Sequence, residues 1–140
     1  MVLKYFYSLM VVFSAIGLFS CGQNETPVDK YVKLLDEATE KTERIHNLDE
    51  LMQARDIISV QEIMEIARES KDYCLKDSDR EKIKKSYDLL LRTTYKKTIE
   101  YGNFTEEMNR RMESQVENFI EEANKRIDKI QTFGELGALQ

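Results

Sequence analysis

The feature that most constrains the fold is a regular spacing of apolar residues in a chain with almost no helix breakers. After residue 26, apolar side chains recur every three or four positions over long stretches, as they do on one face of an α-helix. The only proline is Pro27, and four of the five glycines follow Cys21. Glu, Lys, Arg and Leu, which favour helices, are abundant. The sequence therefore predicts an all-α protein.

Capping signals divide this pattern into segments. Thr26-Pro27 predicts a helix start, because threonine caps helices and proline suits the first helical position. Asn47 with Glu50, and Ser78 with Glu81, have the three-residue spacing of capping boxes, and they predict the starts of two further helices. A fourth start follows at 103–105. The predicted helices cover residues 27–46, 48 to about 75, 78–101 and 105–133.

These helices predict an antiparallel four-helix bundle, because each has an apolar face and the loops between them are short. The alternative is three longer helices, in which the break at Asn47 is only a kink. The second helix is the most apolar around its circumference, so we expect it to lie centrally. Residues 27–133 form the predicted bundle domain. Gly134 is expected to end the last helix, and residues 134–140 form a frayed tail.

The first 21 residues have a different character. Lys4 supplies a positive charge, and an apolar run follows from Tyr5 to Phe19, interrupted only by two serines and a glycine. This run is shorter than the roughly 20 residues that a membrane-spanning helix needs. It fits the apolar region of a secretory signal peptide, which is about 7–15 residues long. Residues 1–20 are therefore predicted to be a signal peptide.

The end of this segment, Leu18-Phe19-Ser20-Cys21, resembles the lipobox of bacterial lipoproteins. Leu18, Ser20 and Cys21 match that pattern, whereas Phe19 is bulkier than the usual residue at its position. The resemblance implies that lipid, including an acyl chain such as palmitate, is attached to Cys21 and that the signal peptide is cut just before it. The alternatives are an ordinary signal peptide with an incidental cysteine, or an uncleaved anchor.

Attachment at Cys21 would hold the domain close to a membrane. Residues 21–26 are a polar tether, and the five of them that follow Cys21 span at most about 17 Å when fully extended. Two acyl chains anchor a protein stably, whereas one binds only reversibly. Gly22 stands where some bacteria use aspartate to retain lipoproteins at the inner membrane. By analogy with lipoproteins we expect the outer membrane of the cell envelope, and its periplasmic side rather than its surface.

Few residues suit catalysis or metal binding. His46 is the only histidine, so no histidine pair for zinc can be built. Cys-x-x-Cys pairs, glycine-rich phosphate loops and nucleophile elbows are absent from the sequence. Cys74 has no intrachain partner if Cys21 carries lipid, and we expect it to be a small buried residue. A reactive or intermolecular role is the alternative for this odd cysteine. We predict no enzyme activity, metal or cofactor.

The charge of the chain bears on its partners. The formal net charge is −5, and Lys4 is the only charged residue before Cys21, so the processed chain would carry −6. Nucleic-acid binding depends on neutralising phosphates, so nucleic acid is excluded as a partner. The predicted function is a non-enzymatic interaction or structural module, with a possible envelope protein partner. The chain resembles the small all-helical lipoproteins of unknown function of Gram-negative bacteria. The alternative is a carrier of a small apolar ligand, held in a cleft between helices. The oligomeric state is open.

Overall fold

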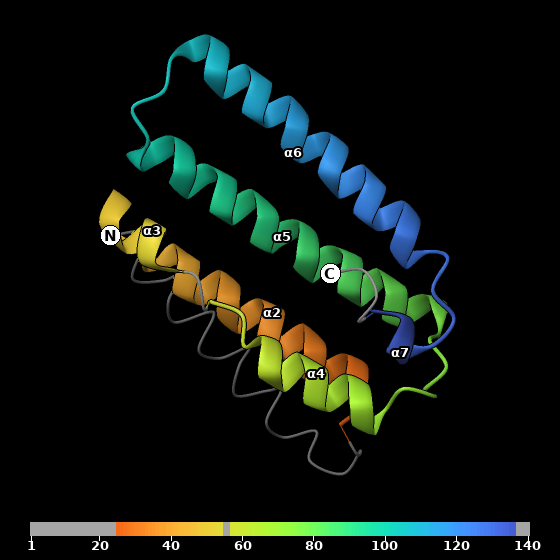
Figure 1. Cartoon of the computed structure of the whole chain (residues 1–140). Coiled ribbons are helices and arrows are strands. Elements are labelled where there is room, and N and C mark those ends of the chain that lie inside the picture. The colour runs from red at the N-terminus through yellow and green to blue at the C-terminus, as the bar shows by residue number, and fades with distance from the viewer. Residues whose placement is uncertain (1–24, 55–56, 137–140) are drawn as a thin grey trace, which may run out of the picture.

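The computed structural model describes residues 25–54 and 57–136, and within them every regular element is a helix (Figure 1). One isolated β-bridge joins Cys74 to Thr132. The predicted all-α class is confirmed. The helices are α2 (Pro27–Glu43), α3 (Leu48–Gln53), α4 (Val60–Glu69), α5 (Asp77–Tyr101), α6 (Glu106–Ile127) and α7 (Phe133–Leu136).

Helix α2 begins where the sequence predicts. Thr26 is the N-cap, and its hydroxyl oxygen accepts a hydrogen bond from the backbone N–H of Asp29 at 3.1 Å. The Asp29 carboxylate accepts in return from the backbone N–H of Thr26, which completes a capping box. Pro27 occupies the first turn, where its missing N–H costs nothing. The folded domain therefore starts six residues after Cys21 in the chain.

Asp29→Asn is expected to lower the free energy of unfolding by about 1 kcal/mol at neutral pH, a loss comparable to that of a helix cap. Asp29 Oδ1 also accepts from Lys82 Nζ of α5 at 2.9 Å. Burial raises the pKa of Asp29, but hydrogen bonds from Lys82 and Thr26 outweigh burial and hold that pKa below 3.8. Ionised Asp29 therefore stabilises the fold above about pH 4, and this contribution is lost as the pH falls through the folded-state pKa.

Urea unfolding at neutral pH and at about pH 2 measures this effect. The difference between Asp29→Asn and the unsubstituted protein should shrink at acid pH. Asp36→Asn, which alters an exposed carboxylate of the same helix, is the matched control and should change stability at neither pH. A stability loss for Asp29→Asn that is the same at both pH values would contradict the assigned role of its charge.

The single second helix predicted from 48 to about 75 is wrong, because the chain forms two shorter helices, α3 and α4, in its place. Asn47 caps α3 as predicted, since its side chain accepts from the backbone N–H of Glu50. Ser59 caps α4 by accepting from the backbone N–H of Glu62. The β-branched residues around Ser59 favour helices weakly, and serine competes for backbone hydrogen bonds, so a new start replaces continuation.

The expected central position of this second segment is also wrong. Ile63 is the only buried residue of α4, and α3 has none. Met52 is 68% exposed and Met64 is 65% exposed. Each short helix can present only one or two turns to the core, so apolar residues on its other sides face outward.

Hydrogen bonds and ion pairs set the directions of the long helices. Lys82 near the start of α5 bonds to Asp29 near the start of α2, and Tyr101 at the end of α5 donates to the Ile45 carbonyl just beyond α2. Helices α2 and α5 therefore run parallel. Arg92 of α5 pairs with Glu117 of α6, and Lys84 reaches Asp128 just beyond α6, so α5 and α6 are antiparallel (Figure 1).

The start of α5 differs by one residue from the prediction. Lys76 is the N-cap position, and its backbone N–H donates to Asp79 Oδ2 at 3.0 Å. The predicted box of Ser78 with Glu81 does not form. Asp79 is buried and has a second polar neighbour, since the Tyr73 hydroxyl lies 3.5 Å from the same oxygen. The buried carboxylate satisfies the cap and displaces the predicted one. The end of α5 at Tyr101, before Gly102, is as predicted.

The C-terminal part departs most from the prediction. Helix α6 ends at Ile127, not at 133, because residues 131–134 pair with the segment after α4. The Leu75 N–H donates to the Gln131 carbonyl, and the Phe133 N–H donates to the Tyr73 carbonyl. Backbone groups that make these bonds cannot continue the hydrogen-bond pattern of helix α6. The predicted tail is wrong for Gly134 to Leu136, which belong to α7, while residues 137–140 lie outside the described part.

The buried core extends from Val28 to Leu136. Phe133 packs edge-on against Tyr31, with ring centroids 5.9 Å apart and planes at 86°. A Cβ at Gly134 would lie 2.9 Å from the Lys71 carbonyl oxygen, so glycine serves a close approach here and not a helix end. Because these core residues all follow Val28, a chain that begins at Gly22 keeps the whole of this core.

Candidate functional site

The predicted lipid-attachment motif, formed by Leu18, Ser20 and Cys21, lies outside the described residues, and lipidation of Cys21 stays a prediction. What the structure places is the end of the tether, where Thr26 caps α2. None of the helices between residues 25 and 136 combines the length and the apolar character that crossing a bilayer requires.

An apolar cavity of about 650 Å³ lies among α2, α4, α5 and α6, and we call it the interhelical cavity. Its size falls within the range of about 300–1,000 Å³ that is usual for small-molecule sites. The segment between α3 and α4 forms one wall through Ile57 and Ile58. Further apolar residues of the wall include Leu35, Ile63, Ile83, Leu90, Leu91 and Ile127.

Two tyrosines place hydroxyl groups among these apolar walls. Tyr31 is buried and Tyr87 is half-buried, and neither hydroxyl has a hydrogen-bond partner within the described residues. Burial raises the pKa of Tyr31 to about 12 and also raises the pKa of Tyr87. Both phenols therefore keep their protons at neutral pH. By contrast, the Thr42 and Thr94 hydroxyls in the wall already donate to backbone carbonyls of their own helices.

Two charged residues of α6 complete the wall. Glu122 and Arg126 are exposed and lie one helical turn apart. Neither Arg126 nor Glu122 makes an ion pair within the described part of the chain, since the neighbouring Lys125 pairs with Glu121, and that hydrogen bond raises the pKa of Lys125. Among the described residues the cavity thus has an apolar interior, two tyrosine hydroxyls and one cation, Arg126, that makes no ion pair.

The sequence indicates this site only in part. It names a cleft between helices as an alternative ligand site without giving its lining, which includes Tyr31 and Tyr87 in the structure. None of the methionines in the described chain lines the cavity. Arg126 is missed, although it follows Phe119 by seven positions and so shares the face of α6 that carries Phe119 and Ala123. A cation in phase with an apolar stripe is the signal that identifies it.

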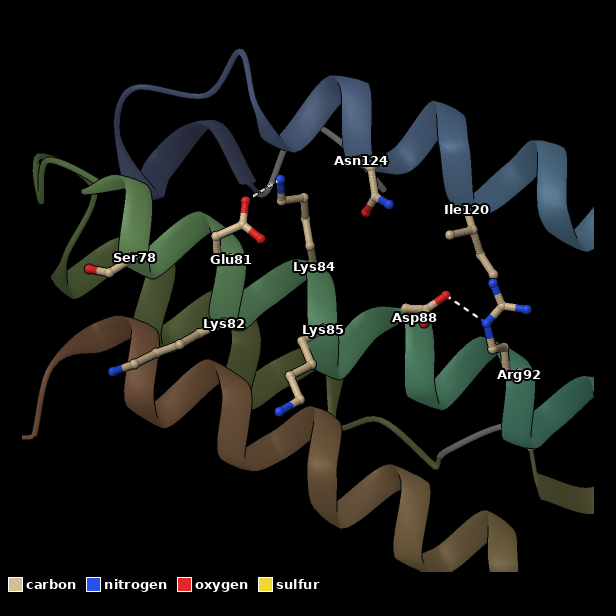
Figure 2. A pocket seen from close by; sticks show the side chains of 9 residues that line it. All are labelled: Ser78, Glu81, Lys82, Lys84, Lys85, Asp88, Arg92, Ile120 and Asn124. Carbon is tan, nitrogen blue, oxygen red and sulfur yellow. Dashed lines mark hydrogen bonds and ion pairs between the residues drawn. The ribbon is translucent and has the colours of Figure 1, made fainter.

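A second hollow is an open groove of about 830 Å³ between α5 and α6 (Figure 2). It is larger than the interhelical cavity but shallow, and its walls are mainly charged. Lys84 and Arg92 extend from α5 toward α6, and Asn124 points back from α6. The Asn124 side-chain oxygen is buried and has no hydrogen-bond partner in the described chain.

The charges of this groove are largely compensated. Lys84 Nζ lies 2.8 Å from Asp128 Oδ1 and also pairs with Glu81, and these hydrogen bonds raise the pKa of Lys84. Arg92 pairs with Glu117 and Asp88, which raises the pKa of its guanidinium. Cations that already have carboxylate partners attract an external anion weakly. The groove therefore joins α5 to α6, and the interhelical cavity is the better ligand site.

A third feature is the outer surface of α3 and α4. Large apolar side chains are exposed there although soluble domains usually bury them. We call this surface the α3–α4 face. Its exposed apolar residues are Leu48, Met52 and Met64.

Cys74 and His46 do not form a reactive site. Cys74 is exposed, so its expected burial is wrong, because successive side chains of an extended, bridged segment point to opposite sides and Leu75 is the one in the core. His46 is exposed, and its backbone N–H donates to Glu50. Across residues 25–54 and 57–136, no three His, Cys, Asp or Glu side chains are grouped to hold a metal ion. Comparison with known proteins finds no matching family model, curated protein or solved structure.

Proposed function

We propose that this chain is a non-enzymatic lipoprotein of a bacterial cell envelope, anchored through lipid on Cys21. Support comes from the match of Leu18, Ser20 and Cys21 to the lipobox and from the capped start of α2 at Thr26. Six residues of chain between lipid and helix keep the domain at the membrane surface. The outer membrane is the proposed location, with the domain on its periplasmic side.

The observation that carries an interaction role is the α3–α4 face. Exposed apolar patches on soluble domains commonly mark contacts with other proteins. Methionine is well suited to such surfaces, because its flexible side chain adapts to a partner. The occupant that we propose is another envelope protein with an apolar surface. For the fold, we propose that α3 and α4 together take the place of one helix of an antiparallel four-helix bundle, beside α2, α5 and α6.

A photo-crosslinking residue at position 64 should give a discrete adduct in intact cells. The same residue at position 113, where Glu113 is exposed on α6, is the matched control and should give none. Met52→Glu should remove the adduct at position 64, because a charge on the α3–α4 face opposes burial against an apolar partner. Equal adducts at both positions, or an adduct that Met52→Glu leaves unchanged, would argue against this face.

The interhelical cavity favours a second candidate function, which is the binding of a small apolar ligand. Its volume of about 650 Å³ and its mostly apolar wall are what such a ligand requires. Lipid anchoring and ligand binding are compatible, since they use different parts of the chain. Calorimetric titration with apolar ligands tests this candidate separately from the anchor.

A further inference from the structure

The interhelical cavity is elongated along the bundle. On α5 its wall runs from Ile83 to Thr94, which is a length of about 16 Å at 1.5 Å per residue. On α6 it runs from Ile127 back to Phe119 in the opposite direction. A long, narrow apolar space of this kind fits a single extended hydrocarbon chain better than a compact ring system.

The polar groups of the cavity gather at one of its ends. The ion pair of Lys84 with Asp128 brings the C-terminal end of α6, and with it Arg126, level with the start of α5. The hydrogen bond between Asp29 and Lys82 brings Tyr31 of α2 to that same level. Tyr87 follows Ile83 by one turn of α5. At the other end, near Leu91 and Phe119, the hydroxyls of Thr42 and Thr94 are already bonded within their own helices.

The charge at the polar end selects the sign of the ligand. Arg126 makes no ion pair in the described chain and lies nearer this end than Glu122, which is one turn back along α6 toward Phe119. Guanidinium groups bind carboxylates through two parallel hydrogen bonds. The protonated hydroxyls of Tyr31 and Tyr87 can donate to an anion beside Arg126.

We propose that the interhelical cavity binds a fatty acid, with the carboxylate at Arg126 and the hydrocarbon chain extending along α5 toward Leu91 and Phe119. The inference rests on the second candidate function and adds the chemical class of the ligand. Arg126 binds and orients the carboxylate, while Tyr31 and Tyr87 supply hydrogen bonds that the apolar walls cannot. Glu122 weakens binding through repulsion, so its charge opposes that of Arg126.

The test is calorimetric titration of a protein spanning residues 22–140, which retains the core from Val28 to Leu136 and lacks an anchor that could compete for the cavity. The probes are saturated fatty acids from octanoate to palmitate and the alcohols of equal chain length, each kept below its micelle concentration. We expect fatty-acid affinity to rise about fourfold per added methylene and to level off once the cavity is full. The alcohols should bind about tenfold more weakly.

Three substitutions locate the site. Arg126→Gln should weaken fatty-acid binding about tenfold and leave alcohol binding unchanged, whereas Arg110→Gln, an exposed residue of the same helix outside the cavity, should change neither. Glu122→Gln should strengthen fatty-acid binding. Ala123→Phe should abolish binding of both probes by filling the cavity. Urea unfolding of each variant shows that it is folded.

The negative outcomes distinguish the fatty-acid inference from the more general proposal that the cavity binds an apolar ligand. Equal affinity for acids and alcohols, or equal weakening of both by Arg126→Gln, overturns the fatty-acid inference and leaves a cavity for neutral apolar ligands. No binding of either probe at any chain length overturns the ligand-binding candidate as well. Unchanged binding by Ala123→Phe places the ligand elsewhere and overturns the proposed site. None of these results affects the lipoprotein anchor.

Discussion

Cys21→Ser is expected to abolish incorporation of a radiolabelled fatty acid and to leave the leader, residues 1–20, attached to the chain. A thiolate is a far better nucleophile than a hydroxyl group, so serine does not substitute in lipid transfer. In lipoproteins that resemble this chain, lipid attachment and cleavage both occur at the cysteine. The measurement is metabolic labelling of cells, followed by electrophoresis and intact-mass determination of the product.

Cys74→Ser is the matched control, because Cys74 is the other cysteine of the chain and is exposed. This variant should be labelled and processed like the unsubstituted protein. Label that persists in Cys21→Ser and disappears in Cys74→Ser would show that the lipid is on Cys74 and not on Cys21. An unlabelled product from the unsubstituted gene would remove the basis for the proposed envelope location altogether.

The helix starts that the sequence predicts best are those with a local chemical signal. Thr26 with Pro27 and Asn47 each cap a helix where expected, because the cap and its backbone partner lie within four residues. The end of α5 before Gly102 is equally local. At the start of α5 two local capping patterns overlap, and the prediction selects the one that does not form. Asp79 is held in the core, and it caps α5 in place of Ser78.

The larger errors have non-local causes. The end of α6 at Ile127 depends on backbone bonds between residues 131–133 and 73–75, and nothing in the apolar spacing of 105–133 reveals them. The division of the second helix has a local signal that the apolar pattern hides. Ile57, Ile58 and Val60 satisfy a helical pattern by hydrophobicity while disfavouring a helix by their branching.

The second large effect concerns Phe133, whose side chain is 1% exposed and packs against Tyr31. Phe133→Ala is expected to lower the free energy of unfolding by about 3–5 kcal/mol, the usual cost of removing a buried phenylalanine. Native domains are stable by only about 5–15 kcal/mol, so this single change removes much of the total. The measurement is urea unfolding of residues 22–140, monitored by circular dichroism.

Phe119→Ala is the matched control, because Phe119 is 54% exposed on α6 and its removal should cost about 1 kcal/mol at most. If Phe133→Ala leaves too little folded protein to measure, Phe133→Leu should give a smaller but resolvable loss. The helix predicted to run to 133 also includes Phe133, but the structure buries this side chain through backbone pairing with Tyr73 and contact with Tyr31. That burial makes the Phe133 variant much the weaker of the two, and an equal loss for both variants would contradict it.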